Sequence, residues 1–284
     1  MGVNTSGTTV IAVYNPKGGV GKTMTACNLA AGLAGKAQVE GRDDDVLLVD
    51  LDRQGNCAHY FRLGGQVLSD ANEGGLCISR VLTGKAHLAD CLLEVRPGLD
   101  LLPSTPELAY AVDELLDADR RATARDRPPR NHVWLDDVLV ERLGPAVGAY
   151  RFIVLDCPPD TGKLKRAIFR FADYVIAPTQ LSPIPLRMTG ENVQEIAAFE
   201  EKAELLWVLP TMTSPFGKDG LPHHLVERQM FAALLRKFKR DRVADHIPES
   251  VRFEEASGLG LSIYEHDPAV ARSYGRLVER VYHV

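Results

Sequence analysis

The stretch of sequence best suited to chemistry lies near the amino terminus, where glycines, a lysine and a threonine follow an apolar run. Residues 10–13 are apolar and rich in β-branched side chains, the run stops at Asn15-Pro16, and glycines follow at positions 18, 19 and 21. From Met24 onward the apolar spacing is that of a helix, so the segment predicts strand, loop and helix. Because glycine lacks a Cβ atom, successive backbone N–H groups can converge on one anion at the start of the helix. The stretch therefore predicts a phosphate-binding loop.

Two side chains at the end of this loop extend the prediction to a nucleoside triphosphate. Lys22 supplies a point charge for the β- and γ-phosphates, and the Thr23 hydroxyl is placed to ligate Mg²⁺. The alternative is a glycine-rich turn that binds nothing. A phosphate loop is favoured because it accounts for the glycines, the Lys-Thr pair, the strand and the helix together. The spacing departs from the standard G-x-x-x-x-G-K-[ST] at Pro16, which is followed by a second lysine, Lys17.

The run N-P-K-G-G-V-G-K-T resembles the deviant Walker A motif of the ParA/MinD (Soj-like) ATPases. The resemblance implies that Lys17 reaches across a nucleotide-sandwich dimer to the phosphates of the partner protomer, as an arginine finger does in other NTPases. Taken alone, Lys17 has a second interpretation as a solvated loop lysine. The resemblance also implies that the nucleotide is bound by Lys17, Gly18, Gly19, Val20, Gly21, Lys22, Thr23 and Met24.

Carboxylates follow two further predicted strands. Residues 46–50 form a buried-strand pattern that ends at Asp50 and leads to Asp52, and Asp156 ends the fully apolar run 152–155. Ligands of open α/β sheets bind at the carboxyl ends of strands, and an aspartate in the position of Asp156 holds Mg²⁺ in the Walker B arrangement. The alternative for Asp50 and Asp52 is that they cap the next helix.

These carboxylates lie in segments that resemble two switches of the same family. The segment D-L-D-R-Q-G-N, residues 50–56, is similar to the family's D-x-D-x-Q-G-N, although Arg53 replaces the usual proline, and D-C-P-P, residues 156–159, resembles its switch II. The resemblance implies that Asp52 positions the attacking water while Asp50, Thr23 and Asp156 form the metal shell. Lys17, Lys22 and Asp52 are then the expected catalytic residues.

Composition indicates an ordinary globular chain. Its 284 residues are 45% hydrophobic and 25% charged, with a formal net charge of -5, so a uniformly basic nucleic-acid binder is excluded but a local basic patch is not. Five cysteines without CxxC spacing favour a reducing compartment. Residues 1–9 lack a signal-peptide pattern, and no apolar run approaches the ~20 residues of a membrane span. We expect a soluble, cytoplasmic protein without a membrane partner.

Strand and helix patterns alternate along the chain, which predicts a doubly wound, mostly parallel sheet flanked by helices. We expect a flexible amino terminus over residues 1–9 and a single P-loop ATPase domain over residues 10–284. An arginine-rich segment at about residues 118–130 is interpreted as an exposed insertion or mobile loop. A solvated charge run is the favoured interpretation of this segment, and a DNA contact is the alternative.

The family resemblance extends from Val10 to the end of the chain and includes residues 247–268. It implies an Mg²⁺-dependent ATPase for DNA partition, whose ATP-bound homodimer binds non-specific duplex DNA on the nucleoid and is released when a ParB-type partner stimulates hydrolysis. It also implies adenine contacts from Pro210, Thr211 and Met212, for which loop packing is an equal alternative. Phosphate contacts of this kind require a basic surface, and the candidates are Arg187, Lys218, Arg236, Lys237, Lys239, Arg240 and Arg252.

Three other functions are compared with DNA partition. A relative that positions another cargo, such as a microcompartment or a chemoreceptor cluster, has the same sequence features. A MinD-like membrane ATPase is less favoured because the apolar spacing of the last helix, residues 269–281, suits the core. A nitrogenase-reductase-like electron donor needs cysteines that bridge a cluster, and Cys57 and Cys157 do not match that pattern; free buried cysteines are the better interpretation.

Overall fold

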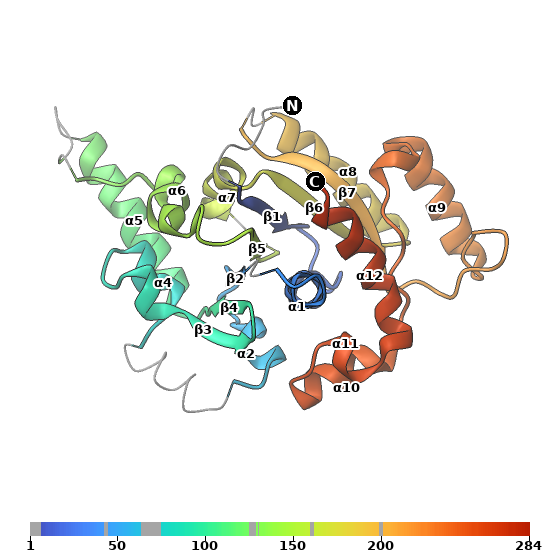
Figure 1. Cartoon of the computed structure of the whole chain (residues 1–284). Coiled ribbons are helices and arrows are strands. Elements are labelled where there is room, and N and C mark those ends of the chain that lie inside the picture. The colour runs from blue at the N-terminus through green and yellow to red at the C-terminus, as the bar shows by residue number, and fades with distance from the viewer. Residues whose placement is uncertain are drawn as a thin grey trace.

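One central sheet positions the residues discussed below (Figure 1). The computed structural model describes residues 7–42, 45–63, 75–124, 129, 131–159, 162–198 and 201–284. Within these ranges seven strands follow the order β3-β4-β2-β5-β1-β6-β7, and all neighbours are parallel except β3 and β4. The strands are β1 (Thr9–Val13), β2 (Val46–Asp50), β3 (Leu93–Arg96), β4 (Leu99–Leu102), β5 (Phe152–Asp156), β6 (Tyr174–Gln180) and β7 (Glu204–Thr211).

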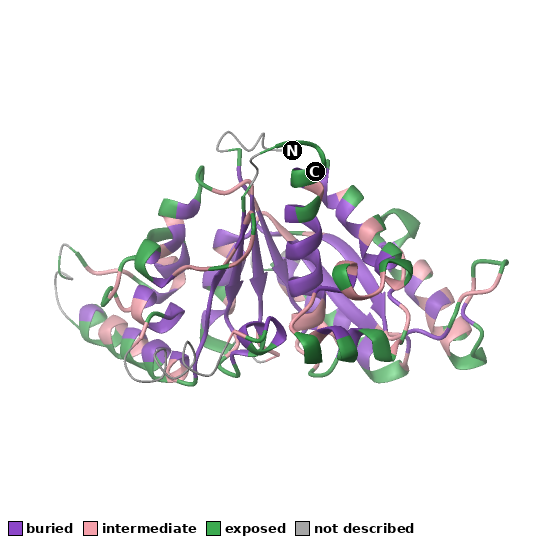
Figure 2. Ribbon diagram, turned by 60° about the horizontal axis from the view of Figure 1, so that its bottom comes forward, coloured by how far each residue is buried: buried purple, intermediate pink, exposed green. Residues whose placement is uncertain are grey.

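Helices cover both faces of the sheet, which is why its central strands are apolar without interruption; Figure 2 shows the buried sheet between helices whose outer sides are exposed. The described helices are α1 (Lys22–Val39), α2 (Asn56–Tyr60), α4 (Ile78–Leu82), α5 (Leu108–Thr123), α6 (Val138–Leu143), α7 (Lys165–Phe171), α8 (Pro183–Ala198), α9 (Leu225–Phe238), α10 (Val251–Leu259), α11 (Ile263–His266) and α12 (Pro268–Tyr282). Short 3₁₀ turns connect them at Leu88–Cys91, Leu135–Asp137, Gly144–Ala146, Gly162–Leu164 and Arg240–Arg242.

Alternate side chains of the strands enter two different cores. Ile11 and Val13 of β1 pack with α1, α2 and the carboxyl-terminal helices, whereas Val10 and Ala12 face the side of α4 to α7. The apolar side of α12 is part of the first core, with Tyr274, Leu277, Val278 and Val281 all buried. The expectation that this helix belongs to the core is confirmed, and none of the described helices is long and apolar enough to span a membrane.

The fold class predicted from the sequence is confirmed, and the structure differs from two local expectations in the bounds of the segments. The amino terminus is ordered from Thr8, whose hydroxyl donates to the carbonyl of Tyr150 at 2.6 Å, and β1 begins at Thr9. The first part of the arginine-rich segment is helical, because α5 continues to Thr123 and buries Ala122; Ala and Arg are good helix formers. Residues 1–6, 125–128 and 130 lie outside the described residues.

The sequence analysis named no element in the region before β4. This region forms β3, a short antiparallel edge strand whose pairing with β4 is irregular between Glu94 and Arg96. Its sequence, Leu-Glu-Val-Arg, alternates apolar and polar residues, but the strand has only four residues and none of its side chains is buried.

Replacing Gly32 with alanine tests how closely α1 packs on the carboxyl-terminal helices. A Cβ atom at Gly32 would lie 2.3 Å from the Tyr264 hydroxyl and 2.6 Å from a methyl of Val278. We expect Gly32→Ala to lower the free energy of unfolding by about 1–3 kcal/mol through overpacking. At Gly35, in the same helix, the new Cβ would meet no atom within 4 Å, so Gly35→Ala should raise stability by about 0.5–1 kcal/mol. Urea unfolding compares the two variants, and equal stabilities would contradict this packing.

Candidate functional site

The loop between β1 and α1 is anchored by a buried asparagine. The side-chain amide of Asn15 donates to the carbonyl of Pro178 at 2.7 Å and to the hydroxyl of Thr189 at 2.9 Å, while its oxygen accepts the backbone N–H of Lys17 at 2.9 Å. Asn15 thus ties the start of the loop to β6 and α8. The sequence analysis assigned it no role, although a polar residue two positions after a buried strand was a signal for one.

The glycines of the loop leave its outer side open. Gly19 and Gly21 have φ angles of 73° and 80°, which side chains rarely adopt. Cβ atoms built at Gly18 or Gly19 would meet no atom within 4 Å. The predicted phosphate loop therefore has the backbone conformation and the free space that an anion needs.

Lys22 lies under this loop, where it is only 8% exposed. Its ammonium group donates to the carbonyl of Lys17 at 2.9 Å, so it stabilises the curved backbone. Burial lowers the pKa of Lys22, and the negative charge of Asp156 offsets part of this effect. The adjacent Thr23 and Met24 are partly exposed at the start of α1.

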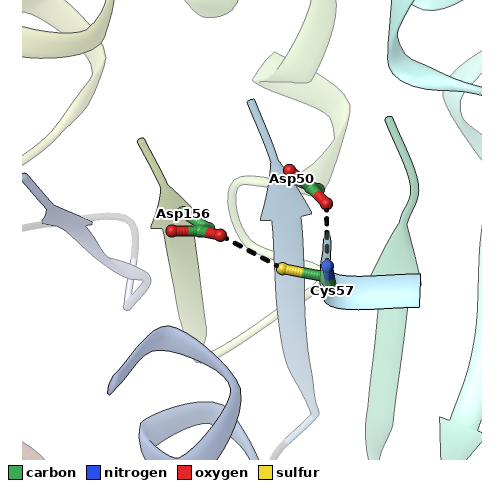
Figure 3. Close-up of side chains that lie close together, drawn as sticks. All are labelled: Asp50, Cys57 and Asp156. Atoms are coloured by element: carbon green, nitrogen blue, oxygen red, sulfur yellow. Dashed lines mark hydrogen bonds between the residues drawn. The ribbon is translucent and has the colours of Figure 1, made fainter. Parts of the chain in front are cut away.

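Asp50 and Asp156 end neighbouring strands, and both are almost completely buried (Figure 3). They are paired in the register of β2 and β5, and Val13 of β1 is paired with Asp156 on the other side. The phosphate loop follows β1, so the predicted carboxylates and the predicted phosphate site meet at one edge of the sheet.

The two carboxylates differ in their hydrogen bonds. Both oxygens of Asp50 accept backbone N–H groups, from Asp52 at 2.9 Å and from Cys57 at 3.0 Å. Oδ2 of Asp156 accepts the Cys57 thiol at 3.4 Å, whereas its buried Oδ1 has no hydrogen-bond partner among the described residues. An unpaired, buried carboxylate oxygen fits a site whose cation completes it.

Burial shifts the acidity of this pair. The pKa of Asp156 is raised to about 6, chiefly by desolvation, against the lowering influence of Thr23 and Cys57. Desolvation and the charge of Asp156 raise the pKa of Asp50 well above its usual value. Two buried carboxylates side by side disfavour each other's ionisation, so a bound cation would stabilise both.

Asp52 lies at the edge of the site, where its side chain is partly exposed. Its carboxylate accepts the backbone N–H of Gln54 at 3.0 Å, and its carbonyl accepts that of Gly55 at 3.0 Å, which closes a turn before α2. The helix-capping alternative holds for Asp50, which accepts an N–H from the first turn of α2, but not for Asp52. The carboxylate of Asp52 is thus available to a group bound above the phosphate loop.

A small cavity of about 100 Å³ lies beside the loop and contains the predicted base contacts in part. Thr211 and Met212 line it, and the Thr211 hydroxyl donates to the carbonyl of Val20 at 2.9 Å. Pro210 does not line it; its carbonyl accepts the N–H of Ile247 at 2.8 Å. Sequence reasoning missed the opposite wall, formed by the segment from Ile247 to Ser250 and by Phe253, Glu254 and Tyr274.

Gln180 is a further residue that sequence reasoning missed. Its side-chain amide lies 3.4 Å from the carbonyl of Gly19 and 3.1 Å from the sulfur of Met212. It therefore connects the phosphate loop to the loop beside the cavity. The signal was its place at the carboxyl end of β6, where ligands of such sheets bind.

The structure divides the predicted DNA-binding residues between the two ends of the sheet. Arg187, Lys218 and Arg252 lie on segments that follow the carboxyl ends of β6 and β7, on the side of the phosphate loop. The other four lie where α9 ends and the chain returns to the start of β7; the backbone there is held by Arg242, which donates to the carbonyl of Leu205. We call these four the α9 basic patch: Arg236, Lys237, Lys239 and Arg240.

The exposed cations of these two groups differ in their partners. Arg252 pairs with Glu255 at 2.7 Å and lies 3.6 Å from Asp267. Arg240 of the α9 basic patch lies 3.8 Å from Asp245, whereas no ion pair is found for Arg236 or Lys239 within the described ranges. The α9 basic patch therefore carries more uncompensated positive charge than the surface around Arg252.

This chain is similar to several known proteins. A family model described as an AAA domain matches residues 8–205. The chain is 33% identical to the chromosome-partitioning ATPase Soj of Thermus thermophilus, over 95% of this chain and 94% of that protein. It is 29% identical to the chromosome partitioning protein ParA of Caulobacter vibrioides, over 96% and 93%. Among solved structures, apo McdA of Cyanothece superposes with a TM-score of 0.78 at 20% identity, over 96% and 99%.

Removing the Asp156 charge should stabilise the ligand-free protein at neutral pH. The pKa of Asp156 rises from 3.8 to about 6 on folding. The free energy of unfolding therefore decreases as the pH increases between these two values, and the whole decrease is present above about pH 6. We expect Asp156→Asn to raise the free energy of unfolding by up to about 3 kcal/mol at pH 7, and the gain should vanish towards pH 4. Urea unfolding at both pH values measures it.

The matched control is Asp241→Asn, which removes an exposed aspartate and should change stability by less than about 0.5 kcal/mol. An Asp156→Asn protein that is less stable than the wild type at pH 7 would contradict the unfavourable burial of this charge.

Proposed function

Because this chain belongs to the family of the ParA and Soj chromosome-partitioning ATPases, we propose that it hydrolyses ATP with Mg²⁺ and uses the cycle to partition DNA. One observation carries this proposal: Lys22, Asp52 and Asp156 converge on an open phosphate loop at one edge of the sheet. In the proposed cycle an ATP-bound dimer binds nucleoid DNA in the cytoplasm, and a ParB-type partner stimulates hydrolysis and releases it.

The residues present fit both ligands. The backbone N–H groups from Gly18 to Thr23 and the Lys22 ammonium would hold the phosphates, and the cavity lined by Thr211 and Met212 would take one edge of the base. Thr23 and Asp156 would hold Mg²⁺, with Asp50 as support, because the buried Oδ1 of Asp156 is unpaired. Bound Mg²⁺ would neutralise charge that develops on the phosphates.

Three side chains would carry the hydrolysis. Asp52, partly exposed at the end of its turn, would accept a hydrogen bond from the attacking water and orient it towards the γ-phosphate. The Lys22 ammonium would stabilise the negative charge that develops on the β- and γ-phosphates during hydrolysis. Lys17 would come from the second protomer, and the hydrogen bond from its backbone to Asn15 would fix the direction in which its side chain leaves the loop.

The edge of the sheet that carries the site also exposes apolar side chains, as protein–protein contact surfaces do. Exposed apolar side chains lie at the starts of α8, α9 and α10: Ile184, Leu225, Val226 and Val251. α8 follows β6, α9 follows β7, and α10 follows a segment that runs parallel to β7 through the bridges of Val243 and Pro248. Apolar groups that surround a polar ligand site favour burial against another protein surface. They support a dimer that closes over the nucleotides at this edge.

We propose that the α9 basic patch provides the main DNA contact. It lies at the end of the sheet away from the phosphate loop, so it would stay free when the loop edge closes in the dimer. Two protomers would then present two such patches, which suits binding to phosphates without reading of bases. Arg187, Lys218 and Arg252, on the loop side, are expected to contribute less to DNA binding.

Replacing Lys17 tests the proposed function most sharply. We expect Lys17→Ala to bind ATP with nearly wild-type affinity but to lose ATP hydrolysis by a factor of about 10³ or more, as for a cation supplied in trans. The wild type should retain duplex DNA at moderate salt with ATP but not with ADP, and Lys17→Ala should retain it with neither. Nucleotide affinity, phosphate release and DNA retention on a filter are measured in parallel.

The control is Lys85→Ala, which removes an exposed lysine that pairs with Glu114 and should leave all three measurements unchanged. Wild-type hydrolysis by Lys17→Ala would contradict the trans role of the lysine. DNA retention by the wild type that is the same with ATP and ADP would contradict the partition function and favour a different cargo.

A further inference from the structure

Cys57 brings a thiol to the two buried carboxylates, and the proposed ATPase cycle does not use it. It is the second residue of α2 and is fully buried. Its backbone N–H donates to Asp50 at 3.0 Å, and its thiol donates to Asp156 at 3.4 Å (Figure 3). The short helix thus places the sulfur over the ends of β2 and β5.

The three side chains have the separations of a metal site. One ligand atom from each of Asp50, Cys57 and Asp156 lies within 4.8 Å of the other two. Ligands at about 2.0–2.3 Å from a tetrahedral ion lie about 3.3–3.8 Å from one another. A small inward movement of these side chains would therefore bring all three to one ion.

The carboxylates have the capacity and the electrostatic need for a cation. The Asp156 oxygen that faces Cys57 is Oδ2, which accepts the thiol, whereas the unpaired Oδ1 points away from Cys57 (Figure 3). Each Asp50 oxygen accepts one N–H, and a carboxylate has about four acceptor positions in all. The Lys22 ammonium acts on Asp156 only from a distance at which it does not bond the carboxylate, since its hydrogen bond goes to the carbonyl of Lys17. A divalent ion would add positive charge directly at the pair.

The sulfur of Cys57 determines which cations the three side chains can bind. Mg²⁺ binds oxygen in octahedral geometry and takes no thiolate, whereas Zn²⁺ and Cd²⁺ bind sulfur with oxygen in tetrahedral sites. We propose that Asp50, Cys57 and Asp156 form a binding site for a thiophilic divalent cation such as Zn²⁺, which displaces Mg²⁺ from Asp156. On binding, the thiol S–H bond breaks, its proton goes to solvent, a metal–sulfur bond forms and a metal-bound water leaves; nothing is oxidised or reduced.

This inference goes beyond the proposed ATPase function, because binding of the ion needs neither nucleotide nor dimer. A bound ion would join α2 to β5 and fix the turn that carries Asp52. If the chain is an ATPase, Zn²⁺ would then inhibit it in competition with Mg²⁺.

Cd²⁺ titration of the reduced, nucleotide-free protein tests the site. We expect an ultraviolet thiolate-to-cadmium charge-transfer band that saturates at one ion per chain. Cys57→Ser should lose the band and weaken Zn²⁺ binding, measured against a chromophoric chelator, by at least about tenfold. The matched control is Cys91→Ser, which alters another buried cysteine and should keep both. The absence of the band from the wild type, or an unchanged band in Cys57→Ser, would overturn the proposal.

A second measurement uses only the wild-type chain. The X-ray absorption spectrum of its one-to-one Zn²⁺ complex should show one sulfur at about 2.3 Å and oxygen ligands at about 2.0–2.2 Å. A first shell without sulfur would overturn the proposal even if Cys57→Ser does not fold. Because both measurements omit ATP, their failure would leave the proposed ATPase function untouched.

Discussion

The burial of two carboxylates at the ends of neighbouring strands is the constraint on which the rest of the site depends. Asp50 and Asp156 are brought together by the register of β2 and β5, and each is less than 2% exposed. Such a pair is unfavourable in the ligand-free chain, which is why the pKa of each is raised. The surrounding features compensate this cost in different ways: backbone N–H groups satisfy Asp50, while Lys22 and an expected cation compensate Asp156. The ligand-free pair is therefore electrostatically unfavourable, and a bound cation would reduce this cost.

The two anchors of the site have different consequences for movement. Asn15 fixes the phosphate loop to β6 and α8 through buried hydrogen bonds, so the start of the loop is preorganised. Asp52 sits in a turn held by Asp50 from below and closed at Gly55, where a Cβ atom would approach the carbonyl of Ser104 to 2.7 Å. Any ligand that changes the interactions of Asp50 or Cys57 acts directly on this turn. A cation bound by Asp50 or Asp156 would therefore affect the position of Asp52.

Much of this arrangement could be predicted from the sequence, because the motifs coincide with strand ends. Apolar runs followed by Lys22-Thr23, Asp50 and Asp156 predict both the sheet and the edge at which these residues meet. The positions of Asn15 and Gln180 near strand ends marked them as candidates, but local patterns could not show what they anchor, since their partners lie far along the chain. Local patterns also misplaced the end of α5, where Ala122 packs in the interior although its neighbours are charged. The split of the basic residues between two ends of the sheet depends on how the chain returns along β7 after α9, which no spacing within one helix reveals.

The central claim is that two copies of this chain close over nucleotide at the edge that carries the phosphate loop. Small-angle X-ray scattering of the Asp52→Ala chain, in which hydrolysis should be blocked, measures its mass and shape with Mg²⁺-ATP and with Mg²⁺-ADP. We predict the mass of a dimer with ATP and of a monomer with ADP. The mass of a single chain with saturating Mg²⁺-ATP would contradict the account.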